Sequence, residues 1–580
     1  MRIVVNGRTM EVPEGSTNLH TLLTGQGVRL TAPCGGNGRC GKCRVRIADA
    51  PTPTGAERAL LSAQDLADGV RLACHTLPVD GMVVTVEEPP ATAHIATEGS
   101  AVAYPLRPPV EVRTVELPPP ALGDQRGDLN RLADGLGLPG LTAGPETLTR
   151  LSQVLREGDW TVTTVCYAET LLDVNPPRAL GVAVDIGTTT LAAYLLDLQT
   201  GDELAVESAL NPQKPWGDDV ISRCDAAGAG ALAGLQAAVT GELNAMVGRL
   251  CARVGAAREQ VFHMTVAGNT VMLHLFAGVS PAQIAQAPFV PVWTGTLDLP
   301  AGGLGLTLHP HAVVTVLPAV AGYVGADTVA AMVAAGLRED GPATLLIDIG
   351  TNGEIALAAG GALYACSTAA GPAFEGAHIS AGMGGVAGAI HRVTTGDGKL
   401  LCRTIGDGPA RGICGSGLLD LVAVLLDVGA IDDTGRMDED TAPGWLTLEG
   451  GRVAVDRERD IWLTGRDVRE VQLAKGAIAA GIQVLLAQAG VRAAEVERVC
   501  LAGGFGSYLD RDSACRIGLL PKELRDRTVA VGNASGAGAK AALLSREAMD
   551  EARRLARAVR YVELSARKDF QDAFLDQMMF

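Results

Sequence analysis

The fold is decided by the stretch Gly181-Val-Ala-Val-Asp185-Ile-Gly187-Thr188-Thr189-Thr190-Leu191, which is answered 163 residues later by Thr344-Leu-Leu-Ile-Asp348-Ile-Gly350-Thr351-Asn352-Gly353-Glu354-Ile355. Each stretch predicts a buried β-strand that ends in an aspartate, a tight turn and a returning strand. Gly187 and Gly350 are expected to adopt backbone angles that other residues avoid and to leave space beside the turn. Consecutive N–H groups and threonine hydroxyls would then face an anion, so each hairpin is predicted to cradle a phosphate.

The two aspartates at the strand ends, Asp185 and Asp348, are predicted to bind Mg2+ or its waters, because this cation takes oxygen ligands and usually keeps several waters. One such hairpin alone would equally well be an ordinary turn. Two copies in one chain favour the phosphate-binding interpretation. The contacts predicted in the two turns are Gly187, Thr188, Thr189, Gly350, Thr351, Asn352 and Gly353.

A third glycine-rich element follows the two hairpins. Val499-Cys-Leu-Ala-Gly503-Gly504-Phe505-Gly506-Ser507 predicts a buried strand that enters a glycine turn, where adenine or ribose would lie against bare backbone. The contacts predicted here are Gly503, Gly504, Phe505 and Gly506. Two hairpins followed by this motif form the order found in the actin, sugar kinase and Hsp70 ATPase superfamily, which residues 181 to about 545 resemble. The resemblance implies a ribonuclease H-like, two-lobed domain that binds ATP.

Composition sets limits on the class of protein. A chain of 580 residues with 47% hydrophobic residues predicts three or four domains with ample cores. A net charge of −17 argues against nucleic acid or an anionic membrane as a partner, since both attract basic surfaces. The N-terminus lacks the apolar segment of a signal peptide, and Asp327 interrupts the longest apolar stretch, so we expect a cytoplasmic protein with no membrane span.

Four of the twelve cysteines lie in the first 88 residues. Their spacing is C-x5-C-x2-C with a fourth cysteine further on, and glycines fill the first loop. This arrangement predicts a [2Fe-2S] cluster, because glycines leave room for the inorganic sulfides and free the amides to bond them. The loop resembles that of adrenodoxin-type ferredoxins, which implies a β-grasp fold. A zinc site is less favoured because the chain has a single C-x2-C pair. The predicted ligands are Cys34, Cys40, Cys43 and Cys74.

The remaining chain divides by composition into a multidomain α/β protein. Residues 1–88 form the ferredoxin domain, 89–109 a flexible Pro- and Gly-rich linker, 110–178 a small α/β middle domain without visible chemistry, and 179–580 the ATPase domain. Residues 211–223 and 263–270 are interpreted as plain loops in preference to cleft-lining segments. The glycine-rich residues 370–385 suggest a mobile cleft mouth. The helix after Gly412 suits an anion and tight packing equally.

The whole chain, in this domain order, resembles the reductive activators of corrinoid proteins. The resemblance implies that the cluster passes one electron to an inactive cob(II)amide on a partner protein, and that ATP makes this step possible and cob(I)amide results. In the mechanism that we infer, Asp185 and Asp348 hold Mg2+ and Glu354 orients the attacking water. Glu354 is equally well explained as a surface residue of its hairpin.

Three rival functions use the same features. A small-molecule kinase with a regulatory ferredoxin domain would transfer phosphate to an acceptor, and a redox-sensing ATP-binding protein would show no turnover. An activator of a radical or dehydratase enzyme would resemble families with a bridging [4Fe-4S] cluster, but no cysteine pair flanks the second hairpin here. The expected partner is the corrinoid protein of a methyltransferase system or a cobalamin-dependent methionine synthase. An upstream electron donor is also implied, and the oligomeric state stays open, with a homodimer as one alternative.

Overall fold

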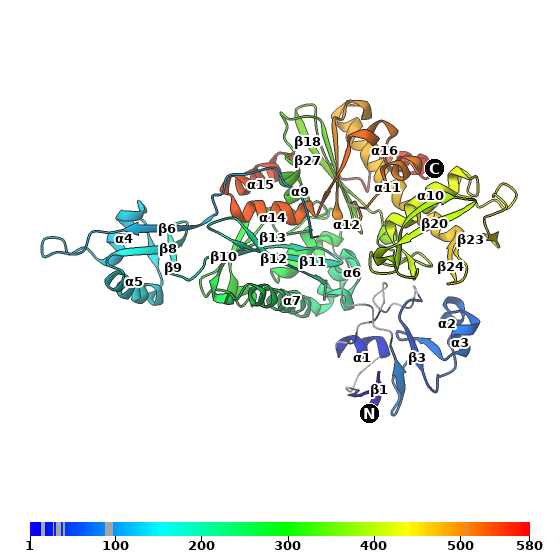
Figure 1. Ribbon diagram of the computed structural model, residues 1–580, viewed down its shortest axis with the longest axis horizontal. Coiled ribbons are helices and arrows are strands. Elements are labelled where there is room, and N and C mark those ends of the chain that lie inside the picture. The colour runs from blue at the N-terminus through cyan, green and yellow to red at the C-terminus, as the bar shows by residue number, and fades with distance from the viewer. Residues whose placement is uncertain are drawn as a thin grey trace.

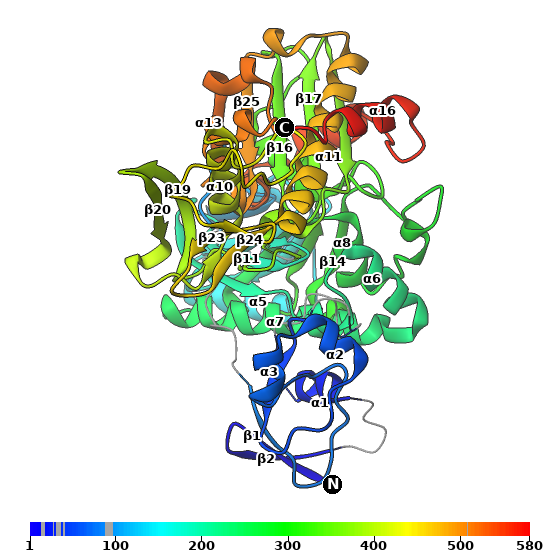
Figure 2. The same ribbon diagram turned by 90° about the vertical axis from the view of Figure 1, so that its right-hand side faces the viewer.

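The computed structural model describes residues 1–12, 18–26, 28, 30, 36, 38, 41–86, 97–376, 378–506 and 508–580. Two of the predicted cluster ligands, Cys34 and Cys40, lie outside these residues. Figure 1 shows a central body that carries the middle domain at its far left and the N-terminal domain at its lower right. Figure 2, turned by 90°, shows the N-terminal domain below the same body.

The N-terminal domain is a five-stranded mixed sheet in the order β2-β1-β5-β3-β4, with helix α1 packed on it. Ile3 and Val5 point into the core from alternate positions of β1, as a half-buried strand requires. Asn18 caps α1 by accepting the amide of Thr21. This is the expected β-grasp arrangement. Its elements are β1 Arg2–Val5, β2 Arg8–Glu11, α1 Leu19–Gly25, β3 Arg44–Ile47, α2 Gly55–Leu60, α3 Ala63–Ala67, β4 Val70–Leu72 and β5 Val83–Thr85.

Of the predicted flexible linker over 89–109, residues 89–96 lie outside the described residues, and the part from Thr97 onward differs from the prediction. Residues 97–107, which we call the strap, are hydrogen-bonded to the body of the protein. The carbonyl of Thr97 accepts the Tyr194 hydroxyl at 2.8 Å, and the Val102 amide donates to Ala334. Gly99 forms a bridge with Gly532, and a Cβ atom at Gly99 would lie 2.2 Å from the backbone oxygen of Asn533. The proline and glycine content of the strap therefore reflects close backbone contact. Composition alone does not distinguish such a packed segment from a flexible linker.

The middle domain is a four-stranded sheet in the order β6-β8-β9-β7 with two helices. Leu132 on α4 and Leu151 and Leu155 on α5 are fully buried against the sheet. The Tyr167 hydroxyl donates to Asp298 at 2.8 Å and so joins this domain to the body. Its elements are β6 Val110–Glu116, α4 Asp128–Leu136, β7 Thr142–Ala143, α5 Pro145–Glu157, β8 Thr161–Tyr167 and β9 Thr170–Val174.

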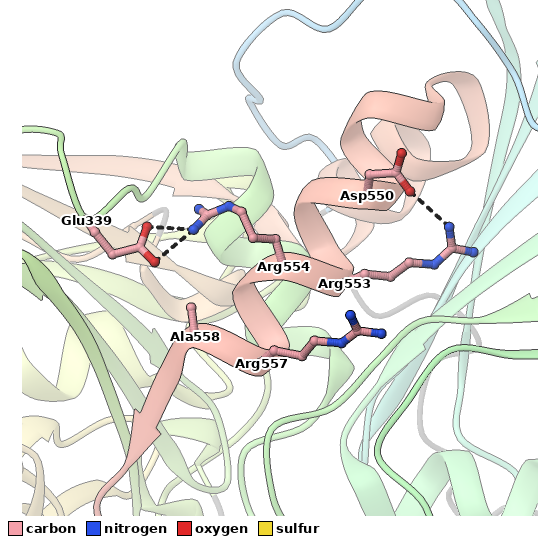
Figure 3. A pocket seen from close by; sticks show the side chains of 6 residues that line it. All are labelled: Glu339, Asp550, Arg553, Arg554, Arg557 and Ala558. Carbon is pink, nitrogen blue, oxygen red and sulfur yellow. Dashed lines mark hydrogen bonds and ion pairs between the residues drawn. The ribbon is translucent and has the colours of Figure 1, made fainter.

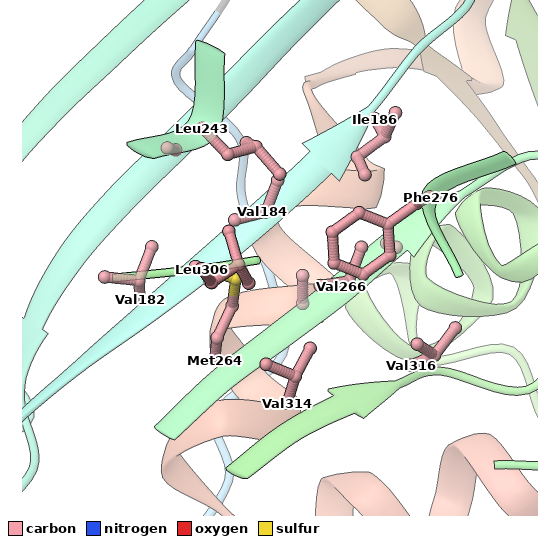
Figure 4. Close-up of a cluster of buried hydrophobic side chains, with 14 of the residues drawn as sticks. Val182, Val184, Ile186, Leu243, Met264, Val266, Phe276, Leu306, Val314 and Val316 are labelled. Carbon is pink, nitrogen blue, oxygen red and sulfur yellow. The ribbon is translucent and has the colours of Figure 1, made fainter. Parts of the chain in front are cut away.

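The first lobe of the body is a six-stranded sheet in the order β12-β11-β10-β13-β15-β14. Figure 4 shows aliphatic side chains of β10, β13 and β15 packed with Leu243 of α7 and Phe276 of α8. Continuous burial of β10 and β13 explains their uninterrupted apolar sequences. The elements are β10 Leu180–Ile186, β11 Thr190–Asp197, β12 Glu203–Leu210, α6 Val220–Ala226, α7 Leu232–Arg253, β13 Val261–Gly268, α8 Thr270–Phe276, β14 Leu297–Pro300, β15 Val313–Val316 and α9 Ala326–Ala335.

The second lobe repeats this plan with a sheet in the order β26-β25-β16-β17-β18-β27. Helix α11 is long and apolar enough to cross a membrane, but 78% of its apolar window is buried against the lobe's core. The elements are β16 Thr344–Ile349, β17 Gly353–Ala359, β18 Ala362–Thr368, β19 Ala389–Gly396, β20 Lys399–Thr404, β21 Gly412–Ile413, α10 Gly415–Asp427, β22 Leu448–Glu449, β23 Arg452–Asp456, β24 Ile461–Thr464, α11 Gly465–Ala489, β25 Arg498–Ala502, α12 Gly503–Gly506, α13 Arg511–Arg516, β26 Thr528–Gly532, α14 Ala534–Leu544, α15 Arg546–Ala558, β27 Val559–Tyr561 and α16 Lys568–Asp576.

Candidate functional site

A cleft of about 670 Å3 is lined by both predicted hairpin turns and by the glycine motif. The two lobes bring them together by the same strand plan. In each lobe the hairpin's first strand, β10 or β16, pairs antiparallel with its return strand and parallel with a third strand, β13 or β25. Of the predicted residues, those lining the cleft are Asp185, Gly187, Thr188, Thr189, Asp348, Gly350, Thr351, Asn352, Glu354, Gly503 and Gly504.

Three predicted contacts stand apart from this group. Gly353 and Gly506 are described but are not among the cleft-lining residues. A Cβ atom at Gly353 would lie 2.7 Å from the Thr368 hydroxyl and 2.9 Å from Ile478, so this glycine serves packing behind the turn. The side chain of Phe505 lies outside the described residues.

The physical reason predicted for the hairpin glycines was wrong. Gly187 and Gly350 do not adopt positive φ angles. A Cβ atom at Gly187 would instead lie 2.8 Å from the carbonyl oxygen of Thr190, so the turn closes too tightly for a side chain. The glycine that needs a positive φ is Gly503, at 86°, where a Cβ atom would also lie 2.6 Å from a carboxylate oxygen of Asp348.

Asp185, Asp327, Asp348 and Glu354 are four of the carboxylates that line the cleft, and the sequence had pointed to three of these four. Asp348 and Glu354 are cross-strand partners in the β16–β17 hairpin, so their side chains lie on the same face of the sheet. Asp185 accepts hydrogen bonds from Asn533 at 3.0 Å and Ser535 at 2.8 Å, at the start of α14. The fourth carboxylate is Asp327 at the N-terminus of α9, and the sequence analysis had considered it only as an interruption of an apolar stretch.

Burial and mutual repulsion change the acidity of these groups. Burial, followed by the charges of Asp327 and Asp185, raises the pKa of Asp348 to about 7. Burial is also the largest cause that raises the pKa of Asp327 to about 7 and the pKa of Glu354 well above its ordinary value. No residue that the structure describes is seen to donate a hydrogen bond to the carboxylate of Asp348. A cation in the cleft would therefore find carboxylates that lack a counter-charge.

The carboxylates in the cleft supply the oxygen ligands that Mg2+ takes. Among the described residues, no group of three His, Cys, Asp or Glu side chains is close enough to enclose a metal ion. Mg2+ is usually bound by one or two carboxylates together with waters and substrate phosphates, so an all-protein cage is not needed. The residues present fit the ion in this form.

The first hairpin is supported by three polar residues from segments that the sequence analysis had interpreted as plain loops. Buried Arg223 donates to the carbonyl of Thr188 at 2.7 Å, and buried Asn211 donates to the carbonyl of Gly187 at 2.7 Å. Asn269, which follows β13, donates to the Thr188 hydroxyl at 3.0 Å. The interpretation as plain loops was therefore wrong for these residues, since the segments hold the turn in place.

Glu375 lies between the two hairpin turns. It belongs to the short 3-10 helix Pro372–Glu375 and lines the cleft. The hydroxyl of Thr351, from the second hairpin, donates to its Oε2 at 3.0 Å, and the hydroxyl of Thr189, from the first hairpin, donates to the same atom at 3.3 Å. Burial raises the pKa of this carboxyl above its ordinary value. The sequence analysis did not identify Glu375 because its role depends on the approach of both lobes.

The cysteine site is described in part. The sulfurs of Cys43 and Cys74 lie 3.2 Å apart, which exceeds the bond length of about 2.05 Å in a disulfide. The described glycines of the loop, Gly36, Gly38 and Gly41, all have positive φ, as a tightly curled loop requires. Converging sulfurs in such a loop fit an iron–sulfur cluster.

The cysteine loop contacts the second lobe. Lys42, between Gly41 and Cys43, donates its Nζ to the carbonyl oxygens of Ile379 and Ser380 at 3.1 and 3.0 Å. Ser380 is in turn held by Asp467 at the start of α11, through its amide at 2.7 Å and its hydroxyl at 3.1 Å. The two predicted sites are thus joined, because Ile379 and Ser380 follow Glu375 in the chain.

A second concavity, of about 510 Å3, lies along α15 and is shown in Figure 3. It is lined by Arg553, Arg554 and Arg557. Arg553 pairs with Asp550 at 3.0 Å, and Arg554 pairs with Glu339 at 2.6 Å. These acidic neighbours offset the guanidinium charges, so this concavity has little attraction for an anion.

Known protein families match nearly the whole chain. Residues 3–79 match the 2Fe-2S iron-sulfur cluster binding domain, and residues 99–179 match the RACo linker region. Residues 180–340 match the RACo middle region, and residues 342–580 match the C-terminal domain of RACo, the ASKHA domain.

Individual relatives are similar over most of their length. The corrinoid activation enzyme RamQ of Eubacterium limosum is 32% identical over 578 residues, which cover 96% of this chain and 94% of RamQ. The [Co(II) methylated amine-specific corrinoid protein] reductase of Methanosarcina barkeri is 26% identical over 69% of this chain and 77% of its own. The solved structure of a reductive activator for corrinoid, iron-sulfur protein is 32% identical with a TM-score of 0.75, covering 100% of this chain and 98% of that one.

Proposed function

The chain belongs to the family of ATP-dependent reductive activators of corrinoid proteins, and we propose that it passes one electron from a [2Fe-2S] cluster to a cob(II)amide, giving a cob(I)amide. It is an activase with an iron–sulfur domain, an ATPase domain of the actin and sugar kinase type and a corrinoid protein as partner. The observation that carries the electron-transfer proposal is the contact of Lys42 with the loop that follows Glu375, because it links the cysteine site to the nucleotide cleft.

We propose that the cysteine site holds the cluster through Cys43 and Cys74, together with Cys34 and Cys40 from the same loop. Bound there, a [2Fe-2S] cluster would supply one electron at a time at low potential. The glycines of the loop keep side chains away from the sulfurs. A Cβ atom at Gly38 would lie 2.5 Å from the ring of His75, which follows Cys74, so a larger residue would disturb the fourth ligand.

In the cleft, Asp185 and Asp348 would hold Mg2+ through its waters, and the ion would neutralise charge on the phosphates of ATP. The turns at Gly187 and Gly350 would contact those phosphates, with Gly503 and Gly504 beside the adenosine. Glu354, raised in pKa beside Asp348, is the group that we propose to orient and deprotonate the attacking water. Its hydrogen bond from Ser367 at 3.2 Å fixes one carboxylate oxygen and leaves the other for water.

ATP assists an uphill reduction only if the protein binds the partner differently in its two nucleotide states. We propose that the ATP-bound form engages the corrinoid protein and favours loss of a cobalt ligand, and that hydrolysis releases the complex. The Methanosarcina relative is named for a methylated-amine-specific corrinoid protein, which favours the corrinoid protein of a methyltransferase system over methionine synthase as partner.

The test is the absorbance change of a purified corrinoid protein on formation of cob(I)amide, with cluster-loaded activator and a chemical reductant. Reduction should require ATP and should be lost with Cys74→Ser. Equal reduction without nucleotide would overturn the proposal. Phosphate transfer to a small acceptor, or ATP binding without turnover, would instead support the kinase or the redox sensor.

A further inference from the structure

We propose that Glu375 is a built-in anion that closes the nucleotide cleft before ATP binds, and that its displacement by ATP releases the cysteine loop from the second lobe. The inference rests on the proposed function, since it requires ATP in the cleft and a cluster in the N-terminal domain. It assigns a conformational switch to a residue and a loop outside the predicted phosphate contacts.

The carboxylate of Glu375 lies between the two hairpin turns. Thr189 and Thr351 come from different lobes, yet both hydroxyls donate to the Oε2 atom of Glu375. A Cβ atom built on Gly350 would lie 3.9 Å from its Oε1 atom. Glu375 therefore occupies the space between the turns in which a phosphate is expected, and it uses the donors that a phosphate would use.

The carboxylate of Glu375 and a phosphate of ATP cannot occupy this space together, because both are negatively charged. A buried carboxylate and a phosphate beside the same turns repel each other at a distance where the protein screens weakly. Among the described residues, Lys214 is the cation whose charge lowers the pKa of Glu375, and burial outweighs it. ATP must therefore expel Glu375 from between the hairpins. The hydrogen bonds by which Glu375 joins Thr189 of the first lobe to Thr351 of the second lobe are then lost.

The loop after Glu375 moves with it as one piece. A Cβ atom at Gly376 would lie 2.4 Å from the carbonyl oxygen of Met383, and one at Gly382 would lie 2.2 Å from the carbonyl oxygen of Gly376. Backbone thus packs directly on backbone where Gly376 meets Gly382 and Met383. A shift at Glu375 is transmitted to Ile379 and Ser380, four and five residues further on.

The carbonyls of Ile379 and Ser380 both accept hydrogen bonds from Lys42. When they move, the cysteine loop loses the hydrogen bonds from Lys42 to Ile379 and Ser380 of the second lobe. ATP binding and docking of the cysteine loop then oppose each other. Because such coupling is reciprocal, a substitution that weakens the contact of the cysteine loop with the second lobe must also strengthen ATP binding.

The experiment compares full-length, cluster-loaded wild type with Glu375→Gln and Lys42→Met. The control is Glu449→Gln, which removes a half-exposed carboxylate of the same lobe that pairs with Arg452 and does not line the cleft. The dissociation constant of a non-hydrolysable ATP analogue is measured by calorimetry. Hydrogen exchange of the peptides covering 41–46 and 379–385 is followed by mass spectrometry.

We expect Glu375→Gln to bind the analogue about tenfold more tightly, the effect of losing one charged hydrogen-bonding partner. Lys42→Met should bind it more tightly by a smaller factor, and Glu449→Gln should match wild type. The analogue should raise exchange of both peptides in wild type. In the two test variants exchange should be raised before nucleotide is added.

Three results would overturn the inference. These are unchanged or weaker binding by Glu375→Gln, unchanged binding by Lys42→Met, and no effect of the analogue on either peptide. Loss of hydrolysis in Glu375→Gln with unchanged affinity would mark Glu375 as a catalytic base instead. If wild type binds no nucleotide, the proposed function itself fails, so the two failures are distinguishable.

Discussion

The sulfur atoms of Cys43 and Cys74 lie 3.2 Å apart although 31 residues separate them in the chain. The pairing of β3 with β4 explains this proximity. Arg44 lies opposite Leu72, and the Ala73 amide donates to the carbonyl of Cys43 at 2.8 Å, so the two cysteines lie at the same end of one antiparallel pair. Cys74, the predicted fourth ligand, is therefore positioned by strand register, while the other three predicted ligands lie close together in the sequence.

Replacement of Cys74 by serine should abolish the visible absorption of the cluster and reduce bound iron, because one iron would lose a thiolate ligand. Affinity for ATP should not change. Cys402→Ser is the matched control, since Cys402 is a half-buried cysteine of β20 remote from Cys43 and Cys74. A cluster spectrum that survives Cys74→Ser would contradict the assignment of this ligand.

Replacement of Asp348 by asparagine should have opposite effects on activity and on stability. ATP hydrolysis should fall by about a hundredfold, as is typical when a group that orients a metal's ligands is lost. The nucleotide-free protein should unfold at a higher temperature, because a buried acid whose pKa is raised to about 7 costs free energy when it ionises near neutral pH. Steady-state hydrolysis and thermal unfolding at pH 8 test both parts. Asp397→Asn, in the exposed turn between β19 and β20, should change neither.

Replacement of Glu354 by glutamine separates water activation from nucleotide binding. Hydrolysis should fall by about 10²–10⁴-fold, the usual contribution of a general base, while affinity for a non-hydrolysable analogue stays within about threefold of wild type. Single-turnover kinetics and calorimetry measure the two quantities. Wild-type hydrolysis by this variant would show that Glu354 is a structural residue of its hairpin.

Burial of His263 predicts a loss of stability at acidic pH. Its Nε2 atom lies 3.0 Å from the Thr315 hydroxyl, and burial lowers its pKa to about 4, an effect that the charge of Asp298 partly offsets. The unfolded chain binds a proton near pH 6.5, so between pH 7 and pH 4 unfolding takes up protons and stability falls as pH falls. At pH 5 this single group would account for about 2 kcal/mol.

The measurement for His263 is the midpoint of thermal unfolding at pH 7 and at pH 5. The decrease between these pH values should be smaller for His263→Phe than for wild type, even though the variant loses its hydrogen bond to Thr315. His378→Asn, which changes a half-exposed histidine with a positive φ, should retain the wild-type decrease. An equal decrease in wild type and His263→Phe would refute the attribution.

Sequence predicts the fold well where the signal is local. The alternation of apolar strand and glycine turn gave both hairpins, and the lone acid at each strand end, Asp185 or Asp348, identified the residues that face the cleft. Spacing identified the cysteine loop. These signals are local because each hairpin and each loop is formed by residues adjacent in the chain.

Other site residues become visible only when distant segments meet. Asn211 and Arg223 hold the first turn from one segment and Asn269 holds it from another, and Glu375 depends on the approach of both lobes. Asp327 carried a usable signal, since a single charge within an otherwise apolar helix is expensive unless it faces a polar site. The strap had the composition of a loose linker because proline and glycine serve close backbone packing as well as freedom.

The attachment of the strap at Thr97 limits how far the N-terminal domain can lie from the ATPase domain. The chain between Val86 and Thr97 can span about 40 Å at most, since an extended residue advances about 3.3–3.6 Å. Next to Thr97, the carbonyl of Glu98 accepts a hydrogen bond from the backbone amide of Asn533, and the side chain of Asn533 donates to Asp185 in the cleft. The N-terminal domain is therefore tethered close to the nucleotide cleft, since Val86 can lie no more than about 40 Å from Thr97.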